Sequence, residues 1–139
     1  MKIAGIIGKR LRGGEVIELV GDLGSGKTTF VRGLAKGMGS SDAVSSPSFT
    51  ISNQYRSKLL TLYHFDFYRL SEPGILAEEL AEVIREPSAV VTIEWADIVE
   101  DILPSERMTI RFSTTGDNSR MLDFSYPDNL SYLIPEVPA

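Results

Sequence analysis

The residues that most clearly indicate a chemical function form the octapeptide Gly-Asp-Leu-Gly-Ser-Gly-Lys-Thr at residues 21–28. This octapeptide fits the pattern G-x-x-x-x-G-K-[ST] of a phosphate-binding loop. Glycines in such a loop let the backbone turn several N–H groups toward one anion, and a lysine, here Lys27, reaches the terminal phosphates. The Thr28 hydroxyl is placed to bind a magnesium ion. The pattern therefore predicts a site for the phosphates of a nucleotide and for Mg²⁺.

The segments on either side of the loop are those that such a loop needs. An apolar run at residues 16–20 comes directly before it and is typical of a buried strand. Residues 30–38 follow it and repeat apolar side chains at helical spacing, with Gly37 and Gly39 to end the helix. We expect the N-terminus of this helix to point at the phosphates.

Two acidic residues, Asp66 and Glu94, each end an apolar run that is typical of a strand. The carboxyl ends of strands in an open α/β sheet form the edge where ligands collect. A phosphate-binding loop needs a partner for its metal and a group that positions the attacking water or the acceptor. Either carboxylate can hold magnesium, directly or through water, so spacing alone leaves the two assignments open.

The remaining segments complete a mixed α/β pattern. We expect, in order, an amphipathic helix at residues 1–11, a hairpin of residues 48–55 and 59–66, a helix at 75–84, a buried strand at 89–94, a helical segment from 96 to 103, and a final hairpin of 108–113 and 121–125. This order predicts a single-domain P-loop NTPase fold of the α/β class, with a mixed central sheet, a β-hairpin insertion and helices on both faces. The predicted domain covers residues 1–125, and residues 126–139, with three prolines, are expected to form a C-terminal tail.

Length and composition limit the class of protein. A chain of 139 residues with 42% hydrophobic content suits one domain with one core. The chain contains no cysteine, which excludes disulfides and thiolate metal sites and fits a reducing cytosol. We find neither a secretory signal nor a stretch long enough to span a membrane, and we expect a cytoplasmic protein without membrane contact.

The net charge of −5 is unevenly divided along the chain. Residues 1–39 hold seven basic side chains against three acidic ones, whereas residues 40–139 hold seven against sixteen. A basic region beside the loop helps to hold a polyphosphate. The acidic remainder argues against strong direct binding of nucleic acid by this chain alone.

Four motifs follow one another in an order that is similar to the TsaE family. They are the loop and helix start at residues 21–30, Ser-Pro-Ser-Phe-Thr at 46–50, His-Phe-Asp-Phe-Tyr-Arg-Leu at 64–70 and Ile-Glu-Trp-Ala-Asp at 93–97. The likeness spans about residues 4–125. Members of this family are bacterial ATPases that act with the TsaB and TsaD proteins in making threonylcarbamoyladenosine next to the anticodon of transfer RNA.

The resemblance implies ATP and Mg²⁺ as ligands. It implies catalytic roles for Lys27, Asp66 and Glu94, and magnesium binding by Thr28 and Glu94. A Ser-Pro-Thr-Phe segment of the family behaves like a switch near the γ-phosphate, and Ser48 stands at its threonine position and keeps the hydroxyl. The implied cofactor-binding residues are Leu23, Gly24, Ser25, Gly26, Lys27, Thr28, Thr29 and Ser48.

The function that we expect is magnesium-dependent ATP binding with slow hydrolysis, in support of transfer RNA modification together with the TsaB–TsaD complex. Two alternatives stay open. One is a small P-loop kinase that phosphorylates a small molecule or nucleoside, and the other is a nucleotide-dependent binding module without significant turnover. A GTPase is disfavoured because the chain contains no Asn-Lys-x-Asp guanine motif.

Three further side chains near these motifs have both a structural and a functional interpretation. His64, the only histidine, is interpreted as a packed or hydrogen-bonded residue rather than a proton shuttle. Trp95 is interpreted as a core residue rather than a stacking platform. Arg69 is either an arginine finger within the chain or the partner of a helix carboxylate such as Glu78.

Overall fold

The computed structural model describes residues 2–22, 26–40, 52–67, 74–114 and 120–135. Within these residues six strands form one mixed sheet in the order β2-β3-β4-β1-β5-β6. Strands β3, β4, β1 and β5 run parallel, while β2 and β6 pair antiparallel to their neighbours at the two edges. The strands are β1 (Val16–Val20), β2 (Ser52–Arg56), β3 (Thr61–Asp66), β4 (Ala89–Glu94), β5 (Met108–Thr114) and β6 (Arg120–Ser125).

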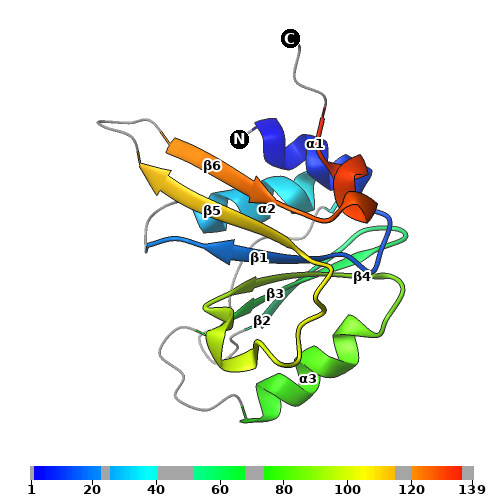
Figure 1. Cartoon of the computed structure of the whole chain (residues 1–139). Helices are drawn as coiled ribbons and strands as arrows, with labels where there is room; N and C mark the ends of the chain where they lie inside the picture. The colour runs from blue at the N-terminus through cyan, green and yellow to red at the C-terminus, as the bar shows by residue number, and fades with distance from the viewer. Residues whose placement is uncertain (1, 23–25, 41–51, 68–73, 115–119, 136–139) are drawn as a thin grey trace.

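Helices cover both faces of this sheet, as Figure 1 shows. One core cluster lies between the sheet and the elements α1 (Lys2–Arg10), α2 (Lys27–Gly37) and the 3₁₀ helix η2 (Asp128–Leu133). A second cluster lies between the sheet and the elements α3 (Gly74–Ile84) and the 3₁₀ helix η1 (Ala96–Val99). Successive side chains of β4 alternate between these clusters, so that Val90 faces α2 and Val91 faces α3. The predicted α/β fold, with a mixed sheet, a hairpin and helices on both faces, is confirmed.

Helices α1 and α2 touch through their backbones, because both carry glycine where they cross. A Cβ atom built on Gly8 would lie 2.3 Å from the carbonyl oxygen of Leu34, and one built on Gly37 would lie 2.3 Å from that of Gly5. No side chain larger than hydrogen fits at Gly8 or Gly37 without displacing a helix. This close contact fixes α2, whose first residue is Lys27, against the rest of its layer.

The segment expected to be a C-terminal tail packs against the fold in part. Residues 128–133 form η2, and Leu130 and Leu133 are buried in the cluster that α1 and α2 share. The Tyr132 hydroxyl donates a hydrogen bond of 2.5 Å to Glu15, and the Arg10 guanidinium donates to the carbonyls of Tyr132 and Ile134. These contacts hold η2 beside α1, while the boundary between a domain at 1–125 and a tail at 126–139 stays a prediction.

Residues 96–103 also differ from their expected helix, since only Ala96–Val99 form a short 3₁₀ helix and turns follow it. Val99 and Leu103 are nevertheless both buried in the core beside α3. None of the helices in the described ranges has the length and apolar character that crossing a membrane requires.

Candidate nucleotide-binding site

The predicted phosphate-binding loop joins β1 to α2. Leu23, Gly24, Ser25 and Ser48 lie outside the described residues, which include the two ends of the loop and the strands beside them. Gly26 has a φ of 104°, a left-handed conformation that favours glycine, and α2 begins directly after it. Lys27 is buried, whereas Thr28 and Thr29 in the same first turn are exposed. The strand and the helix expected on either side of the loop are therefore present.

The ammonium group of Lys27 is held by groups of the protein itself. Its Nζ atom donates to the carbonyl oxygen of Gly21 and lies 3.4 Å from Oε1 of Glu94. The same atom lies 5.3 Å from the centre of the Trp95 ring, a cation–π distance. Lys27 thus lies at the C-terminal end of the loop, paired with a carboxylate of the neighbouring strand.

Glu94 ends β4 with only 5% of its surface exposed. It pairs in register with Leu19, one residue before the end of β1, so its carboxylate lies beside the start of the loop. Its Oε2 atom lies 2.6 Å from Nε2 of His64. Burial alone would raise the pKa of Glu94, but the hydrogen bond and charge of His64, together with Lys27, hold this pKa below its usual value. The carboxylate is therefore ionised at neutral pH.

Asp66 is brought to the same edge by strand pairing. It ends β3 and pairs in parallel register with Glu94. Its side chain is half-buried, so it is more accessible than that of Glu94. The two acidic residues that end strands in the sequence are thus neighbours at the carboxyl edge of the sheet, and the division of roles between them stays a prediction.

Trp95 is not the core residue that its position after a buried strand suggested. Its exposed fraction is 40%, and its φ of 56° is the one positive φ of a non-glycine residue within the described segments. This left-handed conformation turns the chain out of the sheet directly after Glu94 and leaves the ring over Lys27. Beside the loop, the ring helps to line a cavity of about 220 Å³. The other lining residues are Glu18, Leu19, Val20, Gly21, Asp22, Lys27, Ala96 and Asp97.

The oxygen donors at this edge fit a magnesium ion. Mg²⁺ is usually held by one or two carboxylates, with water and substrate phosphates completing its coordination. The Thr28 hydroxyl in the exposed first turn of α2 and the ionised Glu94 carboxylate are donors of this kind. Among the residues that the structure describes, no group of three or more His, Cys, Asp or Glu side chains forms a self-contained metal site.

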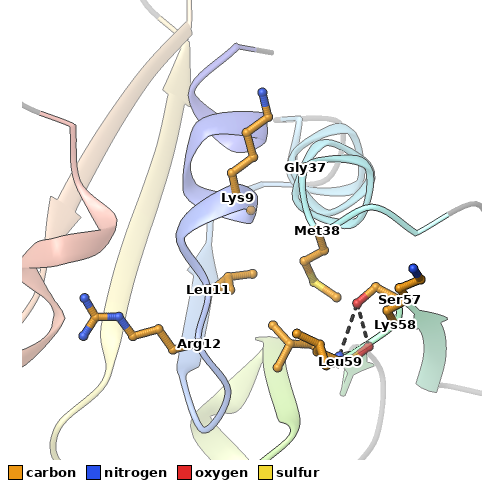
Figure 2. A pocket seen from close by; sticks show the side chains of 10 residues that line it. Lys9, Leu11, Arg12, Gly37, Met38, Ser57, Lys58 and Leu59 are labelled. Carbon is orange, nitrogen blue, oxygen red and sulfur yellow. Dashed lines mark hydrogen bonds between the residues drawn. The ribbon is translucent and has the colours of Figure 1, made fainter.

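A larger cavity of about 400 Å³ lies elsewhere, between the C-terminal ends of α1 and α2 and the turn that joins β2 to β3 (Figure 2). Lys9, Arg12 and Lys58 belong to its rim, but these cationic groups do not converge. The Arg12 guanidinium lies 3.8 Å from the centre of the Tyr132 ring instead. The residues that line this cavity include none of the predicted nucleotide-site residues, so the two cavities are separate.

The chain is similar to proteins of one family over most of its length. The family described as "Threonylcarbamoyl adenosine biosynthesis protein TsaE" matches residues 1–122. The tRNA threonylcarbamoyladenosine biosynthesis protein TsaE of Bacillus subtilis is 40% identical over 84% of this chain and 72% of its own length. The protein of the same name from Nostoc is 41% identical over 86% of this chain and 75% of its own length.

A solved structure agrees with these sequence matches. The crystal structure of YdiB from Bacillus subtilis superposes with a TM-score of 0.74 at 34% identity, covering 95% of this chain and 82% of that one. A TM-score of this size at that identity reflects a common fold. The chain therefore belongs to the TsaE family.

Proposed function

We propose that this chain binds ATP with Mg²⁺ and hydrolyses it slowly, in support of tRNA threonylcarbamoyladenosine biosynthesis together with the TsaB–TsaD complex. The observation that carries the proposal is the pairing of Lys27, at the start of α2, with Glu94, at the end of the neighbouring strand. A lysine at the end of a phosphate-binding loop beside a strand-end carboxylate is what phosphoryl chemistry in a P-loop protein requires. Membership of the TsaE family supplies the biological context.

The contacts of Lys27 suggest how ATP would be bound. Backbone N–H groups at the N-terminus of α2 attract the phosphates, and Lys27 exchanges Glu94 for phosphate oxygens. Glu94 and the Thr28 hydroxyl are the residues that would hold Mg²⁺. When bound, Mg²⁺ neutralises charge on the β- and γ-phosphate oxygens. Leu23, Gly24, Ser25 and Thr29 complete the cofactor contacts that we propose for the loop.

Asp66 is proposed to orient the attacking water. Its position beside Glu94 at the strand edge and its greater exposure suit a group that must reach water next to the γ-phosphate. Ser48 is proposed as a hydroxyl that responds to the presence of that phosphate. Hydrolysis shifts the population of the TsaB–TsaD assembly only if ATP and its products bind two states of the assembly differently.

The test is a mass balance of ATP turnover by the purified chain with Mg²⁺. Hydrolysis predicts that free phosphate and ADP appear at equal rates, and that Lys27→Ala, which removes the phosphate-binding ammonium, reduces both to background. If ADP appears without free phosphate in the presence of a small-molecule acceptor, the protein is a kinase. If ATP binds but neither product appears in a single turnover, it is a binding module.

A further inference from the structure

His64 makes a contact that the proposed mechanism does not use. It lies on β3 with 7% of its surface exposed, and its Nε2 atom is 2.6 Å from Oε2 of Glu94. The other oxygen of this carboxylate, Oε1, lies 3.4 Å from Lys27 Nζ. The two oxygens of Glu94 are therefore divided between a buried ring on the sheet and the lysine of the loop.

Strand pairing directs the His64 ring toward the end of β4. His64 pairs in register with Thr92, and Glu94 lies two residues further along the same strand and thus on the same face. The Thr92 hydroxyl donates to the Tyr63 carbonyl, and the partner of the ring atom Nε2 is the Glu94 carboxylate. Both members of the contact lie on paired strands of a central sheet, which makes their separation well defined.

A glutamate at this position needs such a contact to hold one orientation. The terminal torsion of a glutamate side chain is broad, so a carboxylate with no second anchor can rotate its oxygens past one another at little cost. Hydrogen bonds from neighbouring residues to metal-binding groups fix their orientation, and removing such a bond typically lowers metal affinity or activity by about 10–100-fold.

We propose that His64 is a positioning residue that anchors Oε2 of Glu94, so that Oε1 faces the phosphate-binding loop. Oε1 contacts Lys27 in this structure and would bind Mg²⁺ when ATP is bound. The inference rests on the proposed function, because the role of Glu94 toward Mg²⁺ belongs to that function. With its proton on Nε2, the imidazole donates to the carboxylate and contacts neither the nucleotide nor the metal.

The experiment measures binding of a non-hydrolysable ATP analogue by calorimetry, once with Mg²⁺ and once with EDTA. The ratio of the two affinities is the gain due to Mg²⁺, a quantity that does not depend on turnover. His64→Leu removes the donor, whereas His64→Gln keeps an N–H group near the position of Nε2. We expect His64→Leu to reduce the gain by about tenfold or more and His64→Gln to restore most of it, with affinities in EDTA nearly unchanged.

Thr92→Val is the matched control, since it removes a buried hydroxyl at the paired position without touching Glu94. It should leave the gain intact, and thermal unfolding of each variant reports any loss of fold. An unchanged gain in His64→Leu, or equal losses in the Leu and Gln variants, overturns the inference while leaving the proposed function in place. A wild-type chain that binds the analogue equally well with Mg²⁺ and with EDTA overturns both the magnesium part of that function and the inference.

Discussion

Two glycines three residues apart on α1 should respond in opposite directions to the same substitution. A Cβ atom on Gly8 would meet the Leu34 carbonyl oxygen at 2.3 Å, whereas one on Gly5 has nothing within 4 Å. Ordinary contact begins near 3.4 Å. Gly8→Ala therefore requires α1 to move from α2 by roughly 1 Å, which breaks close packing along the whole helix pair.

The size of the effect follows from two opposing contributions. Overpacking typically costs about 1–3 kcal/mol, and a clash with backbone rather than with a flexible side chain belongs at the upper end. Replacing glycine by alanine in a helix recovers about 1 kcal/mol. Gly8→Ala should then lower the free energy of unfolding by about 1–2 kcal/mol, and Gly5→Ala should raise it by up to about 1 kcal/mol.

Thermal unfolding followed by circular dichroism measures both variants under one set of conditions. For a chain of this size, 1 kcal/mol corresponds to about 4 °C in Tm. We expect Gly8→Ala to melt about 4–8 °C below the wild type and Gly5→Ala to melt above it. Equal shifts of both variants, or a Gly8→Ala variant as stable as the wild type, would refute the backbone contact between α1 and α2.

Further predictions concern the charged groups. Lys27→Ala should weaken ATP binding more than tenfold in calorimetry, because it removes a charge-assisted bond worth about 1.5–3 kcal/mol; wild-type affinity would contradict the site. The pKa of Glu94 is lowered on folding, so its carboxylate stabilises the fold above the unfolded pKa near 4.5, and this contribution is lost as pH falls through the folded pKa. Urea unfolding of Glu94→Gln should therefore show a flatter loss of stability toward acid than the wild type, and parallel curves would exclude the ion-pair argument. Tyr132→Phe should lower the free energy of unfolding by about 1.5–3 kcal/mol, because it removes the hydroxyl that donates to the buried carboxylate of Glu15; an unchanged Tm would show that η2 is not anchored there.

The local parts of the site could be predicted from the sequence because each depends on a short segment. The octapeptide at 21–28 implied a strand before it and a helix after it, and the acidic ends of two apolar runs implied that Asp66 and Glu94 share an edge. The shared edge follows from strand polarity, since parallel strands present their carboxyl ends together.

The contacts between distant segments could not be predicted in this way. The bond between His64 and Glu94 depends on β3 and β4 being neighbours in one particular register, which no local pattern specifies. The exposure of Trp95 depends on a single left-handed residue, which is unusual for tryptophan. The position of η2 beside α1 involves a hydrogen bond from Tyr132 to Glu15, which are 117 residues apart in the chain.

The proposed ATP site of Lys27 and Glu94, in the service of the TsaB–TsaD complex, can be tested by one rate. That rate is phosphate release from magnesium ATP by the purified chain, alone and after addition of TsaB and TsaD from its source organism. The proposal predicts slow release by the chain alone, a sharp increase with both partners, and none with Lys27→Ala in either case. Release that is unchanged by partners shown to bind, or that persists in Lys27→Ala, would contradict it.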